Sequence, residues 1–286
     1  MKELKKLISK DGSVKFLFGL HDNNAIEALY MHDKSNTLTY NSTVCVSSQV
    51  GCKVGCAFCA TTQQGFVRNL SSFEIVNQVD KCNSYCTQAG ADAIKAVVFA
   101  GMGEPLLNYE NVKAAIHRLA SGYGINSFEL ATVGIVPAID KMIEDFKNES
   151  MVIRLNLSLH ASTDEIRDSL IPFNTFFNIS DILDAACRYA EAFNRRVRIR
   201  YMLIKGLNDT QADMDRLCSL LENKPVKLVI SSYNDNQVKG LIPPDREDVE
   251  KFYRFIRDKI DSDIFYNFGS DIAGGCGQLR QTQIAG

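Results

Sequence analysis

Hydrophobic and polar positions follow two different periods along this chain of 286 residues. Near the start, SVKFLFGL alternates apolar and polar side chains, HDNN is a turn signal, and AIEALYM has the composition of a second strand. We therefore expect residues 1–43 to form a short N-terminal β-strand extension.

From Cys45 onward, short apolar runs alternate with longer segments of helical period. AIKAVVFA is a continuous apolar run, as expected for a buried parallel strand. The segment before it, SSFEIVNQVDKCNSYC, predicts a helix with Ser71 or Ser72 as its N-cap. The other expected strands are FELATVG, MVIRLNLSLHA, RRVRIRYMLI, VKLVISSYN and IFYNF. The other expected helices are ENVKAAIHRLA, PAIDKMIEDFKN, DEIRDSL, ISDILDAACRYAEAF, ADMDRLCSLLEN and REDVEKFYRFIRDKI.

This alternation predicts the α/β class. About six strands that alternate with helices form a parallel sheet wrapped by helices, here a partial (β/α)6 barrel. The sequence has no repeats and no low-complexity linkers, so we expect one catalytic barrel over residues 44–286. Ligands of such barrels bind at the carboxyl ends of the strands. The polar clusters GMGEP, TVG, SLH and SYND all fall at those ends, which favours one shared site.

Composition narrows the protein class. No apolar run reaches the ~18 residues of a membrane helix, and the basic start lacks the apolar core of a secretory signal. We therefore expect a cytoplasmic protein that does not contact membranes and whose thiols stay reduced. Nine cysteines are an odd number and a poor disulfide framework, so they indicate metal binding or thiol chemistry.

Charge gives no general sign of a nucleic-acid partner. The net charge is −2, from 32 basic and 34 acidic residues, whereas many nucleic-acid enzymes are basic. Any RNA contact must then come from local patches. In RRVRIR, period-two alternation places Arg196, Arg198 and Arg200 on one strand face and the apolar residues between them toward the helices. That face predicts either phosphate contacts at the barrel mouth or a solvated edge.

A group of cysteines is the main chemical signal. Cys52, Cys56 and Cys59 have the spacing C-x3-C-x2-C. A structural zinc site takes four ligands, usually in two C-x2–4-C pairs, and the only further pair, Cys82 and Cys86, is more simply explained as two helix residues. A [4Fe–4S] cluster normally takes four cysteines. With three, one iron stays open for a small ligand, such as an amino acid that chelates through its amine and carboxylate.

A glycine-rich turn supports that interpretation. FAGMGEPLLN places glycines at the end of a buried strand, where the backbone can approach a ligand closely. The carboxylate of Glu104 can accept hydrogen bonds from a ligand ammonium.

With these motifs in place, the chain resembles the radical S-adenosylmethionine (SAM) enzymes, whose cluster motif is C-x3-C-x2-C with an aromatic residue, here Phe58, before the last cysteine. CVSSQVGC, FCATTQQGFVRNL, GMGEPLLN, TVGIVP, SLHA, LIKGLND and DIAGGCGQL together resemble the RlmN/Cfr family. That family methylates adenine in 23S ribosomal RNA, at C2 and also in tRNA for RlmN-type members, and at C8 for Cfr-type members. The similarity covers residues 11–279.

The resemblance implies a two-stage mechanism with a [4Fe–4S] cluster on Cys52, Cys56 and Cys59. Two SAM molecules are used per turnover. The first methylates Cys276. The second is cleaved to a 5′-deoxyadenosyl radical, which takes hydrogen from that methyl group, and the resulting carbon radical adds to the adenine. Cys45 then helps release the product through a disulfide with Cys276.

The resemblance also assigns further site residues. It implies that the SAM-binding residues are Gly103, Glu104, Ala131, Ser158, Leu159, His160 and Asn234. Ala131 stands where the family has a serine, so only a backbone contact would remain there. Glu27 matches a proposed proton acceptor. The simpler alternatives are a structural histidine at position 160, an exposed strand carboxylate at position 27 and an ordinary surface cysteine at position 276.

Three functions remain open at this point. The leading expectation is methylation of an adenine carbon in rRNA or tRNA, with C2 favoured, by a monomer that receives electrons from flavodoxin or ferredoxin. The family's helical RNA-binding accessory domain is expected to be absent, because the sequence starts at the strands after it. The second interpretation keeps the radical chemistry with a protein or small-molecule target. The third is a non-catalytic RNA-binding protein with a cluster or zinc, against which the presence of both Cys45 and Cys276 argues.

Overall fold

The computed structural model describes residues 1–32, 41–236, 238–266, 268–269, 271–272, 274–275 and 278–280. The strands are β1 (Lys2–Ile8), β2 (Val14–Gly19), β3 (Ala25–His32), β4 (Ser42–Val46), β5 (Gln49–Gly51), β6 (Phe66–Asn69), β7 (Ala96–Phe99), β8 (Ser127–Thr132), β9 (Val152–Ser158), β10 (Val197–Leu203), β11 (Val226–Ser232) and β12 (Ser262–Ile264). The α-helices are α1 (Ser72–Ala89), α2 (Tyr109–Tyr123), α3 (Val136–Phe146), α4 (Asp164–Leu170), α5 (Ile179–Phe193), α6 (Gln211–Leu221) and α7 (Arg246–Arg257). The 3-10 turns are η1 (Thr62–Gln64), η2 (Pro105–Asn108) and η3 (Pro172–Thr175).

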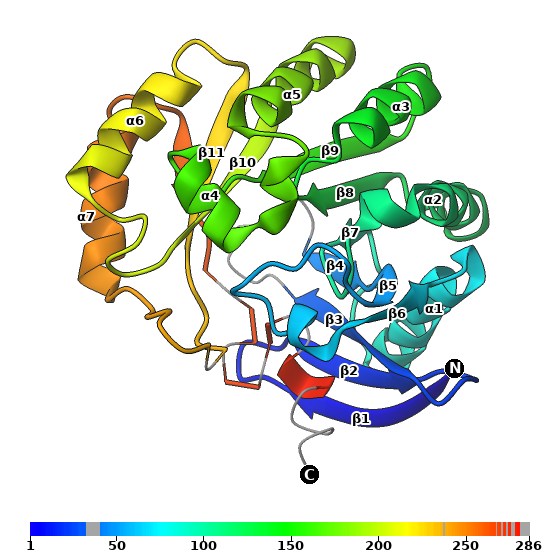
Figure 1. Ribbon diagram of the computed structural model, residues 1–286. Coiled ribbons are helices and arrows are strands. Elements are labelled where there is room, and N and C mark those ends of the chain that lie inside the picture. Colours follow the sequence, from blue (N-terminus) through cyan, green and yellow to red (C-terminus); the bar gives the residue numbers. More distant parts are fainter. Residues whose placement is uncertain are drawn as a thin grey trace.

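One curved sheet organises the molecule. Its ten strands run in the order β1-β2-β3-β4-β7-β8-β9-β10-β11-β12. All neighbours from β4 to β12 are parallel, whereas β1, β2, β3 and β4 pair antiparallel. The helices lie around the outside of the parallel part (Figure 1). The predicted α/β fold with a partial barrel of parallel strands is thus confirmed.

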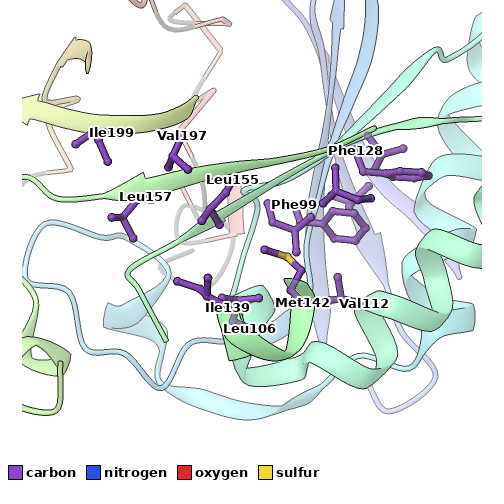
Figure 2. Close-up of a cluster of buried hydrophobic side chains, with 14 of the residues drawn as sticks. Phe99, Leu106, Val112, Phe128, Ile139, Met142, Leu155, Leu157, Val197 and Ile199 are labelled. Carbon is purple, nitrogen blue, oxygen red and sulfur yellow. The ribbon is translucent and has the colours of Figure 1, made fainter. Parts of the chain in front are cut away.

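The core lies between the strands and the helices that cover them. Figure 2 shows side chains from the strands, among them Phe99 and Phe128, facing Val112 of α2 and Met142 of α3. All four are at most 1% exposed. The alternation predicted for β10 is also confirmed, since the apolar residues between its arginines are completely buried. Among the described residues, no helix is both long and apolar enough to cross a membrane.

Most expected elements are present, and the differences have local causes. Helix α1 begins after Ser71, which forms a capping box with Glu74. The strand expected at IFYNF is misplaced, because β12 spans Ser262–Ile264. The amide of Phe265 still donates to the carbonyl of Ile230 at 2.7 Å, and its ring lies 4.3 Å from the guanidinium of Arg200. The β5–β6 ribbon that brackets the cysteine loop was not expected, because its strands are very short.

The strands of residues 1–32 continue the barrel sheet rather than forming a separate layer. β3 pairs with β4, the first parallel strand. In Figure 1 the end of the described chain, drawn in red, lies beside β1 and β2. The last described residues therefore lie beside the first strands of the sheet.

Close backbone approach joins the ends of β4 and β7. The amides of Ser48 and Gln49 both donate to the carbonyl of Met102, at 2.8 and 3.1 Å. A side chain at Gly101 would place its Cβ 2.6 Å from the carbonyl oxygen of Val46. Gly103 has φ +101°, and a Cβ there would lie 2.5 Å from the side chain of Gln49. The GMGEP glycines are required by this packing.

A buried arginine joins the ends of β8 and β9 to α4. The guanidinium of Arg167, which is 1% exposed, donates to the carbonyls of Val133 at 2.6 Å, Ser158 at 3.0 Å and Leu159 at 3.2 Å. It also donates to Oδ1 of Asn174 at 2.6 Å. Burial lowers the pKa of Arg167 to about 10, so the side chain remains charged at neutral pH.

We predict that Arg167→Met lowers the free energy of unfolding by about 3–5 kcal/mol, because several buried carbonyls lose their donor. Urea denaturation followed by circular dichroism measures the change. Arg188→Met is the matched control. It breaks a pair with Asp140 in which both side chains are nearly half exposed, so a loss below about 1 kcal/mol is expected. Equal losses in the two variants would contradict this role of Arg167.

Candidate functional site

The cysteine loop is held at both of its ends. It leaves β5 and returns through β6, and the amide of Cys52 donates to the carbonyl of Gly65 at 3.3 Å. Gly51, with φ +77°, allows this closure, since a Cβ there would lie 1.7 Å from the same carbonyl oxygen. In the middle of the loop, the amide of Ala57 donates to the carbonyl of Leu170 at the end of α4. The loop is therefore fixed against the barrel mouth.

All three cysteines of the motif line one cavity of about 130 Å³. The same cavity is lined by strand-end residues Gly101, Gly103, Glu104, Ala131, Thr132, Ser158 and His160, and by loop residues Phe58, Thr61 and Thr62. Predicted ligands of the cluster and of SAM thus meet in one small space. We call it the cysteine cavity.

Burial keeps two of these thiols neutral. It raises the pKa of Cys52 to about 12 and the pKa of Cys56 well above its usual value, and the neighbouring sulfurs add to the effect at Cys56. A thiolate here needs a cation close by. A metal centre is the natural partner for such a set of buried sulfurs.

The donor set fits a cluster better than one ion. Among the described residues, no three His, Cys, Asp or Glu side chains are grouped to hold a single metal ion. A cubane cluster has another requirement, because each cysteine ligates a different iron, so three thiolates leave the fourth iron open. In the described part of the chain, the buried hydroxyls of Thr61 and Thr62 have no hydrogen-bond partner. They offer donors to a group that occupies the cysteine cavity.

Glu104 places a carboxylate beside the thiols. It is 3% exposed, and its oxygens accept from the amides of Leu106 and Val133, each at 3.0 Å. Burial raises the pKa of Glu104 to about 7. A bound ammonium would stabilise the charged form of this carboxylate, because its positive charge offsets the cost of removing the negative charge from water.

His160 has a structural role as well as a place in the cavity. Its Nδ1 accepts from the amide of Met202 at 3.1 Å, and its ring meets Phe58 edge-on at 5.3 Å. Burial lowers the pKa of His160 to about 3. Ser158 also lines the cavity. By contrast, the side chain of Leu159 lies in the hydrophobic core and lines neither cavity described here.

A second, larger cavity of about 330 Å³ adjoins the first, since Ala100 and Ala131 line both. Cys45, from β4, lines this larger cavity, as do Asn234 and the pair Gly274 and Gly275. Cys45 is 9% exposed and packs against Leu29 and Met31. The predicted resolving thiol therefore lines the cavity that adjoins the cysteine cavity.

The arginine strand enters the larger cavity in part. Arg198 and Arg200 line it, whereas Arg196 is exposed and pairs with Asp261. Arg198 pairs with Glu129 at 2.9 Å. Burial lowers the pKa of Arg200 to about 10. The solvated-edge interpretation is thus wrong for Arg198 and Arg200 and correct for Arg196.

The remaining predicted residues lie elsewhere. Cys276 is outside the described residues. Glu27 is 2% exposed, so the alternative of an exposed strand carboxylate is wrong. It pairs with Lys15 at 2.7 Å and lines neither cavity. Cys82 and Cys86 are buried in the main core, as the simpler interpretation of that pair expected.

The sequence did not reveal a bridge between the cysteine loop and the end of the chain. Asn236 donates to the carbonyl of Phe58 at 2.8 Å and accepts from Gln278 at 2.6 Å. Gln278 in turn accepts from the amide of Gly275 at 2.9 Å. Only the asparagines after β11, in SYNDN, could have drawn attention to this contact.

The fold and the cysteine loop define the class of protein. The family model described as the radical SAM superfamily matches residues 46–218. A crystal structure of a radical SAM methyltransferase from Sphaerobacter thermophilus superposes with a TM-score of 0.89 at 34% identity, over 97% of this chain and 80% of that one. The cofactors of this superfamily are a [4Fe–4S] cluster and SAM.

Relatives narrow the class further. The dual-specificity RNA methyltransferase RlmN of Nautilia profundicola is 38% identical over 97% of this chain and 80% of its own length. RlmN 2 of Myxococcus xanthus, named in the same way, is 40% identical over 96% of this chain and 72% of its own length. The chain belongs to the RlmN family of radical SAM methyltransferases.

The buried state of His160 predicts a pH dependence of stability. The pKa of His160 is about 3 in the folded protein, against an ordinary value of 6.5. Below pH 6.5 this histidine is protonated in the unfolded chain but stays neutral in the folded chain. The contribution of His160 to stability is therefore fully present above pH 6.5 and is lost as the pH falls toward 3. We expect a loss of about 2 kcal/mol from this residue between pH 7.5 and pH 5.

Urea denaturation at both pH values tests this in wild type and His160→Gln, which cannot titrate. The loss on acidification should be smaller in the variant by about 2 kcal/mol. His21→Gln, which removes a histidine with an 82% exposed side chain, is the matched control and should behave as wild type. An equal pH dependence in wild type and His160→Gln would contradict the buried neutral state.

Proposed function

We propose that this chain methylates an adenine carbon of RNA, with C2 favoured over C8, in rRNA or tRNA. The observation that carries the proposal is the pair of adjoining cavities. One gathers three thiols and Glu104, and the other holds Cys45 and the glycines that precede Cys276 in the sequence. A radical formed in the first cavity would then lie close to a group held in the second.

The cysteine cavity is the proposed cofactor site. Cys52, Cys56 and Cys59 would hold a [4Fe–4S] cluster, which with SAM supplies a 5′-deoxyadenosyl radical. Glu104 would accept hydrogen bonds from the SAM ammonium, and the backbone of Gly103 would lie beside it. The proposed further SAM contacts come from residues Ala131, Ser158, His160 and Asn234, and from the backbone of Leu159.

The larger cavity is the proposed site of methyl transfer, with two SAM molecules used per turnover. Cys276 would accept the first methyl group, and Cys45 would resolve the covalent product by forming a disulfide with Cys276. Glu27 is kept as the proposed proton acceptor on the resemblance alone, since its carboxylate lines neither cavity and bonds to Lys15 and to the amide of Arg280.

The chemistry of the larger cavity suits a nucleobase. Its volume of about 330 Å³ lies in the usual range of small-ligand sites, about 300–1,000 Å³. Arg198 and Arg200 supply cationic, planar groups that can stack on a base or bind phosphate. Within the described part of the chain, Oδ1 of Asn156 is buried without a partner and can accept from an amino group in this cavity.

The comparisons favour RNA over a protein or small-molecule target, because the matched relatives are named as RNA methyltransferases. The overall charge of −2 leaves the RNA contact to local groups such as these arginines. We further propose that the chain acts as a monomer in the cytoplasm and receives electrons from a flavodoxin or ferredoxin. Residues 1–43 would then be an extension of a barrel formed by residues 44–286.

Nucleoside mass spectrometry of rRNA and tRNA from cells with and without the gene tests the function. We expect 2-methyladenosine to be present only with the gene. Appearance of 8-methyladenosine instead would overturn the choice of carbon, and unchanged RNA in both fractions would overturn the proposed substrate.

The Cys45→Ala variant tests the assignment of roles. Without the resolving thiol, the protein should stay covalently joined to RNA under turnover, which a gel shift under denaturing conditions detects. Cys187→Ala removes a helix cysteine that lines neither cavity and should release its product. Free methylated RNA from Cys45→Ala would remove that residue from the mechanism.

A further inference from the structure

The end of the described chain is held by the N-terminal strands. We call the described residues between Gly269 and Arg280 the tail segment. It lies beside β1 and β2 (Figure 1), and three groups of contacts join it to residues 9–27. None of these contacts was expected from the sequence.

The first contacts fix the start of the tail segment. The carboxylate of Asp11 accepts from the amide of Gly269 at 2.8 Å. Asp271 accepts from the hydroxyl of Ser9 and from the amide of Lys10, the latter at 3.2 Å. The turn between β1 and β2 thus holds the tail segment where it approaches the larger cavity.

The second contacts come from Lys15 of β2, which is 2% exposed. Its ammonium lies 2.7 Å from Oε2 of Glu27. It also donates to the carbonyls of Gly274 at 3.3 Å and Gly275 at 3.1 Å. An ammonium has three N–H donors, so one lysine side chain can bind a carboxylate and backbone carbonyls at the same time.

The third contact fixes the end of the tail segment. Oε1 of Glu27 accepts from the amide of Arg280 at 2.6 Å. Leu279 and Arg280 are 1% and 8% exposed, so their side chains are packed into the protein. The two oxygens of one carboxylate therefore serve both Lys15 and the chain beyond Cys276.

The cost of burying this pair indicates that it does more than stabilise the fold. Removing two charges from water is expensive, and an apolar pair often stabilises a protein as well or better. Here Lys15 and Glu27 bond to backbone atoms of Gly274, Gly275 and Arg280, which lie on both sides of residues 276–277 in the sequence. Gly274 and Gly275 also line the larger cavity together with Cys45.

We infer that Lys15 is a positioning residue that, together with Glu27, clamps the backbone before and after Cys276 against the N-terminal strands. The role of Cys276 in this inference rests on the proposed function, whereas the clamp itself does not. Residues 1–32 thereby acquire a task in the reaction, because they hold the backbone of Gly274, Gly275 and Arg280 on either side of the methyl-accepting residue in the sequence.

Hydrogen–deuterium exchange of the full-length protein tests the clamp. In Lys15→Met we expect the amides of residues 274–280 to exchange at least about tenfold faster, because hydrogen bonds to charged groups are lost. Exchange in β9 should be unchanged. Lys15→Arg, which keeps the charge, should restore part of the protection. Lys5→Met, on the exposed strand β1, is the matched control and should match wild type.

A second variant guards against a simple folding defect. Lys15→Met leaves the buried Glu27 carboxylate without its cation, so Lys15→Met/Glu27→Gln removes the charge of both partners. It should show the same local increase in exchange over residues 274–280. Faster exchange throughout the protein in both variants would overturn the clamp in favour of a purely structural role.

Intact-protein mass spectrometry then measures the fraction of Cys276 that carries a methyl group after expression with SAM present. We expect a fall of about tenfold in Lys15→Met, partial recovery in Lys15→Arg and no change in Lys5→Met. Wild-type exchange over residues 274–280 in Lys15→Met overturns the clamp. Faster exchange with an unchanged methylated fraction overturns the positioning role. An unmethylated wild type counts against the proposed function, and the exchange result still decides the clamp.

Discussion

The parallel alignment of β4, β7, β8 and β9 is the constraint on which the site depends. Their carboxyl ends share one edge of the sheet, so residues far apart in sequence must meet there. Close backbone contact between Met102 and Ser48 brings the ends of β4 and β7 together without room for side chains at Gly101 and Gly103. Arg167 does the same for the ends of β8 and β9 through its buried hydrogen bonds. The two cavities are a consequence of these contacts.

Desolvation sets the protonation states of the side chains at that edge of the sheet. Buried thiols at Cys52 and Cys56 resist ionisation without a cation, and the buried carboxylate of Glu104 favours a nearby positive group. A site of this kind favours a cationic centre beside the sulfurs and an ammonium beside the carboxylate. Ala100 and Ala131 line both this site and the cavity that holds Cys45.

Local sequence patterns predicted much of the fold and of the site, but they did not predict the long-range contacts. The apolar run before GMGEP and the spacing of Cys52, Cys56 and Cys59 predicted a strand end and a metal loop, because both depend on neighbours in sequence. Lys15 gave no such signal, since its partners at Gly274 and Gly275 are about 260 residues away. The end of β12 was misplaced because Phe265 packs on Arg200 from another strand. By its composition, the segment IFYNF is suited to a strand.

The central claim is that three thiolates hold an iron–sulfur cluster with an open position beside the larger cavity. Metal and sulfide analysis of anaerobically reconstituted protein, followed by electron paramagnetic resonance of the reduced sample with and without SAM, tests it most directly. The account predicts about four irons and four sulfides per chain, a signal that changes when SAM is added, and loss of the cluster in Cys56→Ala but not in Cys187→Ala. Zinc without iron, or a signal that SAM leaves unchanged, would contradict it.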